Sequence, residues 1–313
     1  MAHHHHHEPD LTSVGFRLFL TMGLNFLITI AEVVGGILSG SLALISDALH
    51  NFSDGISVII SYIALRLKQR DFSYRHTFGL KRAEILAAII NSSVLIIISV
   101  YLFYESILRF INPEPIRGQL MTIVALVGLA ANVLGTILLH RDSRHSMNIR
   151  SAYLHLFSDA VSSVGVVLGG IAIMYWNATW VDPVLTILIG LYIIRESFHI
   201  VAQAVHILME GAPPDLSLKE IQQEVESLPE VQDIHHLHVW MVGENDVHLE
   251  GHVNVQDMLI SESEKLREKI EHLLREKFHI AHITLQFECN RCTDEGLIRR
   301  KEHDPWHSHG DKP

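Results

Sequence analysis

The fold is decided by an uncharged stretch in the middle of the chain, Gln119–Leu139, which reads QLMTIVALVGLAANVLGTILL. A helix needs about 20 consecutive apolar residues to cross the hydrocarbon core of a bilayer, and this stretch supplies them. Five further stretches are long and almost as apolar, with a few charges each, near residues 14–38, 42–67, 83–110, 151–176 and 183–208. The sequence therefore predicts an α-helical membrane protein with six transmembrane helices.

The distribution of charge divides the chain into two parts. Residues 1–209 carry 13 basic and 13 acidic side chains, whereas residues 210–313 carry 11 basic and 22 acidic ones, so the net charge of −11 lies entirely in the second part. A neutral apolar part followed by an acidic polar part indicates a membrane domain joined to a soluble domain. The apolar composition disfavours a disordered chain, a nucleic-acid-binding protein and a purely cytosolic enzyme, and two cysteines are too few for a disulfide framework.

Basic residues gather in alternate connections between the predicted spans. The connections on the opposite side hold little charge beyond Arg117 and Asp182. The basic connections lie between spans two and three and between spans four and five, with Lys68, Arg70, Arg75, Lys81, Arg82, Arg141, Arg144 and Arg150. Because basic loops are retained in the cytoplasm, both termini and the acidic tail are expected to be cytoplasmic.

The periodicity of the sequence changes after Gly211-Ala212-Pro213-Pro214. Helices are expected from Ser217 to about residue 228 and over 261–278, the second with a capping box formed by Ser261 and Glu264. Strands are expected over 231–242, 247–255 and 282–288, where apolar and polar residues alternate. The order α-β-β-α-β predicts a C-terminal cytoplasmic α+β domain that is metallochaperone-like in its order of elements.

Four segments follow from these patterns. Residues 1–12 form an N-terminal tail, whose histidines His3 to His7 are interpreted as an expression tag, with a native metal-collecting tail as the alternative. Residues 13–209 form the six-helix transmembrane domain and residues 210–290 the cytoplasmic domain. Residues 291–313 are polar and are expected to form a flexible C-terminal tail.

Ionisable side chains inside predicted spans two and five carry the chemistry. Span two contains His50 and Asp54, and span five contains His155 and Asp159, so both spans show the pattern His-x-x-x-Asp. A spacing of four residues places both groups of a pair on one face of a helix. Two imidazoles and two carboxylates together form a tetrahedral ligand set suited to Zn²⁺, and imidazole disfavours hard cations such as Mg²⁺.

A single His-x-x-x-Asp pair could equally be a hydrogen-bonded structural pair. Two copies on two predicted spans favour the metal interpretation, because ionisable groups deep in a bilayer are costly and need a compensating role. Asp47 lies near the same helix face as His50 and Asp54. It could be a proton carrier, an entrance charge or a helix-cap partner, and a supporting role is expected for it.

Polar residues on two strands of the tail domain form a second candidate site. His252 shares one strand face with His248 and Glu250, and Glu288 lies on the polar face of the last strand. If these strands pair, His252 and Glu288 can lie on one sheet surface, although a solvated polar face is the competing interpretation. The Cys289-x-x-Cys292 pair is a weak signal alone, because a zinc knuckle needs four ligands.

These residues together resemble the cation diffusion facilitator family. The resemblance rests on the two His-x-x-x-Asp pairs and on the segments Gly40–His50 (GSLALISDALH) and Thr77–Glu84 (TFGLKRAE). It implies a homodimeric metal/proton antiporter, and the histidine version of the paired motif resembles the zinc-transporting branch. The short connection His140–Arg150 is similar to bacterial members, which implies the bacterial cytoplasmic (inner) membrane.

The resemblance also implies roles for individual residues. The transport-site ligands correspond to His50, Asp54, His155 and Asp159. A second site found in some members would involve Asp71 and His76, but Leu80 stands where that site has a further histidine. The cytoplasmic metal site corresponds to His235, His252, Glu264, Gln286 and Glu288, with Glu264 and Gln286 in place of histidines. A charge interlock between the tail and the membrane helices corresponds to Arg82 and Glu210.

The expected function is export of Zn²⁺ from the cytoplasm, driven by inward flow of H⁺, by a homodimer in a lipid bilayer. Zn²⁺ is expected as transported substrate and as a regulatory ion, with no organic cofactor. The alternatives are a membrane metal sensor or channel, and a transporter whose main substrate is Cd²⁺, Co²⁺, Fe²⁺ or Mn²⁺. A membrane metalloenzyme is disfavoured, because four convergent ligands close the metal shell and no His-Glu-x-x-His motif is present.

Overall fold

The computed structural model describes residues 11–68, 74, 77–140, 147–243, 246–289 and 296–298. Two compact units are present. The first comprises residues 1–65 and 87–201, and the second comprises residues 66–86 and 202–313. Several residues discussed above lie outside the described parts, namely His3 to His7, Asp71, His76 and Cys292.

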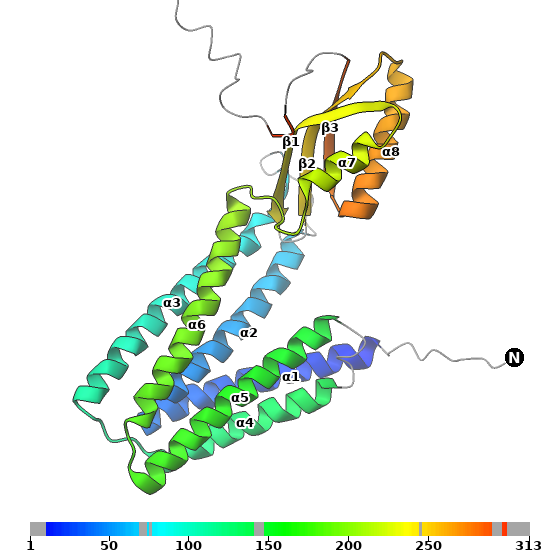
Figure 1. Ribbon diagram of the computed structural model, residues 1–313. Coiled ribbons are helices and arrows are strands. Elements are labelled where there is room, and N and C mark those ends of the chain that lie inside the picture. Colours follow the sequence, from blue (N-terminus) through cyan, green and yellow to red (C-terminus); the bar gives the residue numbers. More distant parts are fainter. Residues whose placement is uncertain are drawn as a thin grey trace, which may run out of the picture. The chain divides into compact units, whose positions relative to one another are not determined.

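Six long helices precede the sheet domain (Figure 1), and they confirm the helical membrane architecture predicted from the sequence. They are α1 (Leu11–Ser39), α2 (Leu42–Lys68), α3 (Arg82–Ile111), α4 (Gly118–His140), α5 (Met147–Trp176) and α6 (Val181–Leu208). Within the described residues, four helical segments are long and apolar enough to cross a membrane. They are α3, α4, α6 and residues 153–176 of α5. The acidic and histidine side chains of α2 lower its hydropathy.

Helix α4 packs against both α1 and α5 in the first unit (Figure 1). Small residues allow the close approach of α4 and α5: a Cβ atom at Gly170 would lie 2.5 Å from Thr122 Oγ1, and one at Gly118 would lie 2.8 Å from the Met174 backbone nitrogen. Helix association in membranes depends on such small residues, because lipid tails remove the hydrophobic driving force between helices. The packing of α5 against α4 fixes the orientation of the α5 face that carries His155 and Asp159.

The turn between α1 and α2 is fixed by a buried carboxylate from α6. Gly40 adopts a φ of 76°, which ends α1, and α2 begins two residues later. Asp182, which is fully buried, accepts hydrogen bonds from Ser41 Oγ at 2.5 Å and from the backbone N–H groups of Leu42 and Ala43 at 3.0 and 3.2 Å. The first N–H groups of a helix have no acceptor within the helix, so the Asp182 carboxylate of α6 supplies the acceptor for the start of α2.

The second unit contains a three-stranded sheet and two helices. Its elements are α7 (Leu218–Glu226), β1 (Val231–Gly243), β2 (Asp246–Val255), α8 (Ile260–Phe278) and β3 (His282–Glu288). The strand order is β1-β2-β3, with β1 and β2 antiparallel and β2 and β3 parallel. The predicted α-β-β-α-β order is therefore confirmed.

The two helices pack against the sheet through apolar side chains. The buried core includes Ile221, Val225, Ile234, Leu249, Val253, Leu266, Ile270 and Leu274. Ser217 caps α7 by accepting from the Glu220 N–H at 3.3 Å, as the sequence predicts. The expected cap of α8 was wrong, because the helix begins one residue earlier: Leu259 is the N-cap, and its N–H donates to Glu262 Oε2 at 3.1 Å.

Replacement of Asp182 by alanine removes three hydrogen bonds from the start of α2. We expect Asp182→Ala to lower the stability of the purified chain in detergent by about 2 kcal/mol, because buried helix N–H groups lose their acceptor. Thermal melting measures this change. Glu196→Ala is the matched control on the same helix, since Glu196 is exposed and pairs only with the neighbouring Arg195 among the described residues. Equal melting temperatures for the two variants would contradict the capping role.

Candidate metal sites

The four predicted membrane ligands come together in the first unit. His50 Nε2 lies 3.7 Å from Asp54 Oδ2 and 3.6 Å from Asp159 Oδ1, so it contacts carboxylates of both helices. His155 Nε2 lies 3.2 Å from Asp54 Oδ2 and 3.5 Å from Asp159 Oδ2. Each imidazole therefore faces one carboxylate of its own helix and one of the other, which is the arrangement that the repeated motif predicts.

The carboxylates of this membrane cluster are short of donors. Asp159 is 3% exposed, and neither of its oxygens accepts a hydrogen bond from a described residue; the same holds for Oδ2 of Asp54. The His50 ring also packs edge-on against Tyr192, with ring centres 5.7 Å apart. Buried polar atoms are normally paired. A divalent cation among these oxygens and the imidazole nitrogens would satisfy them, so the donor set fits a borderline metal ion.

Asp47 lies beside this cluster, one helical turn before His50 and Asn51. It is 3% exposed, and its Oδ1 accepts a hydrogen bond from Ser162 Oγ of α5 at 2.8 Å. The bond joins α2 to α5 next to the two motifs. A supporting role for Asp47 therefore has a structural partner, and the role itself stays a prediction.

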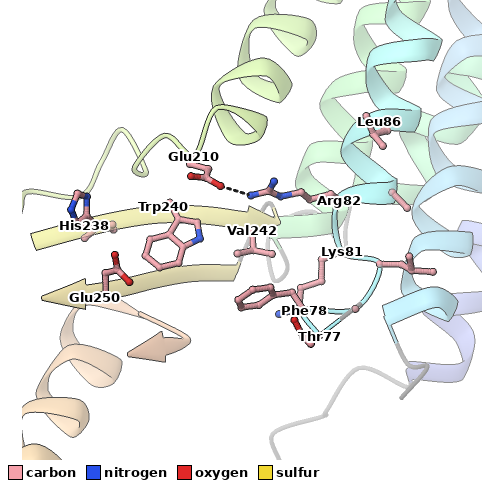
Figure 2. Close-up of a pocket in the computed structure, with 14 residues that line it drawn as sticks. Thr77, Phe78, Lys81, Arg82, Leu86, Glu210, His238, Trp240, Val242 and Glu250 are labelled. Atoms are coloured by element: carbon pink, nitrogen blue, oxygen red, sulfur yellow. Dashed lines mark hydrogen bonds and ion pairs between the residues drawn. The ribbon is translucent and has the colours of Figure 1, made fainter. Parts of the chain in front are cut away.

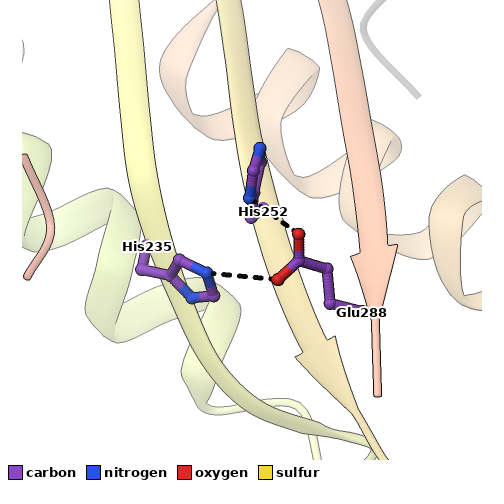
Figure 3. A group of neighbouring side chains, drawn as sticks. All are labelled: His235, His252 and Glu288. Atoms are coloured by element: carbon purple, nitrogen blue, oxygen red, sulfur yellow. Dashed lines mark ion pairs between the residues drawn. The ribbon is translucent and has the colours of Figure 1, made fainter. Parts of the chain in front are cut away.

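A second cluster lies on the sheet of the second unit and is formed by His235, His252 and Glu288 (Figure 3). His252 Nδ1 lies 2.9 Å from Glu288 Oε1, and His235 Nε2 lies 3.6 Å from Glu288 Oε2. One ligand atom from each of the three residues lies within 4.8 Å of the others. We call this group the sheet cluster.

Strand register explains why these residues meet. His235 of β1 lies opposite His252 of β2, and the parallel pairing of β2 and β3 sets Gln286 opposite His252 and Glu288 opposite Asn254. Three neighbouring strands thus contribute one ligand each. The sequence alone suggested the pairing of β2 and β3 but did not supply the register.

Two other residues assigned to this site by resemblance are placed differently. Glu264 lies on an exposed face of α8, where Arg267 binds it and lowers its pKa, and it does not reach the sheet cluster within this chain. Gln286 is adjacent to the cluster, and its Nε2 donates to Glu288 Oε1 at 2.7 Å. Gln286 thus orients the carboxylate. Cys289 is exposed, and its predicted partner Cys292 lies outside the described residues.

Asp233 supports the sheet cluster and was not singled out from the sequence. Its Oδ1 lies 2.6 Å from His235 Nδ1, and its Oδ2 accepts from Asn254 Nδ2 at 2.9 Å. A hydrogen bond at Nδ1 leaves Nε2 of His235 as the metal-binding atom, as second partners of metal-binding histidines commonly do. The spacing in the sequence could have indicated this contact, because Asp233 and His235 are two residues apart in a strand and therefore share a face.

A pocket of about 720 Å³ in the second unit is lined by residues 77–83 and by strands β1 and β2 (Figure 2). Arg82 Nη2 lies 3.4 Å from Glu210 Oε1 at its edge, so the two predicted interlock residues are in contact. Their side chains are 40% and 67% exposed. Exposed pairs of this kind contribute about 0–1 kcal/mol, and the interlock role stays a prediction.

A second ion pair near this pocket was not predicted. Lys81 Nζ lies 2.9 Å from Asp246 Oδ1, and these side chains are 19% and 15% exposed. Phe78 of the same segment packs on the His248 ring, with centres 5.3 Å apart. The segment 78–82 therefore contacts the sheet through an aromatic pair and the Lys81–Asp246 ion pair, which is shorter and less exposed than the Arg82–Glu210 pair to the residues after α6.

Helical spans that bring ionisable groups together in their interior, followed by a small α+β domain, define the class of multi-pass membrane transporters. Comparison with known proteins agrees. The model of the cation efflux transmembrane domain matches residues 18–209, and the model of the cation efflux protein cytoplasmic domain matches residues 213–289.

Several relatives match nearly the whole chain. It is 38% identical over 297 residues to the zinc transporter ZitB of Pectobacterium atrosepticum. This alignment covers 94% of this chain and 91% of the relative. It is also 38% identical over 301 residues to the cadmium, cobalt and zinc/H(+)-K(+) antiporter of Bacillus subtilis, which covers 95% of each. The metal-bound C-terminal domain of the CzcD transporter from Cupriavidus metallidurans aligns with 23% of this chain and 99% of that domain at 33% identity, with a TM-score of 0.21.

The chain therefore belongs to the cation efflux family. This confirms the predicted resemblance to a family of integral membrane metal transporters, and the relatives named above are metal transporters and not enzymes.

His248 gives the second unit a predicted dependence on pH. Burial lowers the pKa of this imidazole, with the His282 imidazole and the Lys81 ammonium as further causes, so folding favours the neutral form of His248. An unfolded histidine has a pKa of about 6.5. The stability that His248 contributes is therefore present above about pH 6.5 and is lost as pH falls through its lower folded pKa.

We expect His248→Gln to reduce the loss of stability between about pH 7.5 and 5.5. Thermal melting of the full chain in detergent at both pH values measures the effect. His272→Gln, at an exposed position of α8, should leave the wild-type pH dependence unchanged. An identical pH dependence in wild type and His248→Gln would show that His248 does not contribute.

Proposed function

We propose that this transporter exports Zn²⁺ from the cytoplasm through the cluster of His50, Asp54, His155 and Asp159, in exchange for protons that move inward. The observation that carries the proposal is the meeting of two imidazoles and two donor-poor carboxylates from α2 and α5, with nitrogen-to-oxygen distances of 3.2 to 3.7 Å. Two nitrogen and two oxygen donors suit Zn²⁺. The relatives named zinc transporter and cadmium, cobalt and zinc antiporter support this substrate class.

Proton exchange follows from the chemistry of these ligands. Zn²⁺ binds neutral imidazole and ionised carboxylate, so binding displaces any proton that the four groups hold. Imidazole changes its charge near physiological pH, so an inward supply of protons competes with the metal. A cluster that opens alternately to each side would load Zn²⁺ from the cytoplasm and release it where protons enter.

The remaining parts of the proposal concern setting and selectivity. Both termini are proposed to be cytoplasmic in a bacterial inner membrane, and the cytoplasmic domain is proposed to join two copies into a homodimer. Imidazole favours Zn²⁺, Cd²⁺ and Co²⁺ over the harder Mn²⁺. A metal sensor of the same fold would bind the ion without moving protons, and flux measurements separate the two functions.

Alanine at any one of the four membrane ligands should abolish zinc-driven proton flux in proteoliposomes, because three remaining donors leave the ion incompletely coordinated. The chain should still insert and purify. His199→Ala is the matched control, since this exposed histidine of α6 is outside the cluster. Retained flux in Asp54→Ala or Asp159→Ala would reject the site, and absence of flux in the wild type would reject proton antiport.

The sheet cluster is proposed to bind Zn²⁺ as a regulatory ion. Two observations support this role: the ligand atoms of His235, His252 and Glu288 lie within 4.8 Å of one another, and Asp233 and Gln286 hold two of the three ligands in orientation. Three protein ligands leave one position for water or for a group from a second copy. Because the domain carries the excess of negative charge, a bound cation also offsets repulsion within it.

Zinc should stabilise the full chain through the sheet cluster when the membrane cluster is removed by Asp54→Ala. At a zinc concentration about a hundred times the Kd, the gain is about 2.7 kcal/mol and appears as a higher melting temperature. His252→Ala in the same background should lose this gain, whereas His272→Ala should keep it. Equal stabilisation by zinc in both variants would show that His252 is not a ligand.

A further inference from the structure

A buried acid of α1 has no role in the proposed metal site. Glu32 is 1% exposed and lies in a helix whose neighbouring residues are apolar. Its Oε2 accepts a hydrogen bond from Asn51 Nδ2 at 2.9 Å, while its Oε1 is buried and accepts none from the described residues. No lysine, arginine or histidine in the described part of the first unit forms an ion pair with it.

The fold reserves space for this carboxyl group. Gly128 of α4 faces Glu32, and a Cβ atom at that position would lie 2.4 Å from Oε1. Any other residue at position 128 would therefore displace the carboxyl. The facing helix α4 also has no charged side chain between residues 119 and 139 that could compensate a negative charge.

Glu32 is connected to the metal cluster through one residue. Asn51, which is 2% exposed, directly follows His50 in α2. The carboxylates of Asp47 and Asp159 also act electrostatically on Glu32 from α2 and α5. A change of charge at Glu32 therefore alters the electrostatic potential at the cluster, because the effective dielectric constant of a protein interior is low. For the same reason, a cation in the cluster alters the electrostatic potential at Glu32.

We propose that Glu32 is a proton-binding site of the transport cycle, held beside the metal cluster by Asn51 and Gly128. A bare carboxylate without a cation or a full set of donors is costly in a buried site, whereas a carboxylic acid is neutral and has an O–H donor. A metal ion needs several ligands, whereas the side-chain hydrogen bond that Glu32 makes to a described residue comes from the Asn51 amide N–H, which is a donor and cannot bind a cation. The remaining small cation is H⁺.

The proposal rests on the proposed proton exchange and names one of its proton carriers. Zn²⁺ entering the cluster adds positive charge near Glu32, which favours the carboxylate, so the proton leaves to water. Protonation of Glu32 then disfavours Zn²⁺ by the same free energy, because coupling between two binding sites is reciprocal. Zinc and a proton would thus exclude each other without sharing a ligand.

Three variants test this in the full-length chain. Glu32→Gln keeps an oxygen that accepts from Asn51 and cannot ionise; Glu32→Asp keeps an ionisable group; Asn51→Ala keeps the carboxyl and removes its partner. The measurement is the number of protons released per Zn²⁺ bound, by calorimetry in buffers of different ionisation enthalpy, with the pH profile of flux in proteoliposomes. Wild-type chain without any proton release would refute proton exchange itself, independently of Glu32.

Glu32→Gln should bind Zn²⁺ and release about one proton fewer per ion than wild type, with a shallower pH profile of flux. Asn51→Ala keeps the carboxyl but loses the donor that holds it, so this variant should shift the pH profile of flux. Wild-type proton release and pH profile in Glu32→Gln would overturn the proposal, and so would complete loss of Zn²⁺ binding, which would make Glu32 a structural residue. If Glu32→Gln fails to insert, Glu32→Asp decides, because a proton carrier requires a shifted pH profile and an unchanged profile overturns it.

Discussion

The cost of burying charge governs the first unit of this protein. Within the described residues its buried or half-buried acids without an arginine partner are Glu32, Asp47, Asp54, Asp159 and Asp182, whereas Glu105, Glu114 and Glu196 pair with arginines. Asp182 accepts from the start of α2, Asp47 accepts from Ser162, and the two motif aspartates face imidazoles. Since an uncompensated charge inside a membrane is expensive, these contacts decide where the helices can sit. The helices of this unit are therefore positioned as much by polar contacts as by apolar packing.

The sequence predicts most of the fold because the governing patterns are local. Runs of apolar residues located the helices, and alternation located the strands, with limits within a few residues of those observed. The repeated His-x-x-x-Asp spacing predicted two helix faces that meet. The cap of α8 failed because Ser261 and Leu259 compete for the same helix start, and local propensity favours serine whereas the structure uses the Glu262 side chain at Leu259.

The residues that the sequence did not reveal make contacts between distant parts of the chain. Ser41 and Asp182 are 141 positions apart, and Lys81 and Asp246 are 165 apart. No spacing rule connects such residues, so in the sequence Lys81 and Asp182 are indistinguishable from ordinary loop charges. Glu32 was detectable as a lone acid in an apolar stretch, yet its partner Asn51 gives no signal of its own. The sheet cluster was partly predictable. Its histidines and carboxylate indicate a metal site from the sequence, but only the strand register shows that they lie side by side.

The two proposed metal sites differ in charge in a way that suits their surroundings. In the proposed membrane site two carboxylates would balance the charge of Zn²⁺, so a loaded site with neutral imidazoles would be neutral overall and less costly to hold inside a bilayer. The sheet cluster has one carboxylate among its three proposed ligands, so a Zn²⁺ bound there would keep a positive charge, which the Asp233 carboxylate beside His235 would partly offset. That charge lies in the part of the chain that carries all of the net negative charge, where it is favoured. The acidic composition of the tail, which first marked it as a separate domain, would thus compensate for the second carboxylate that the proposed sheet site lacks.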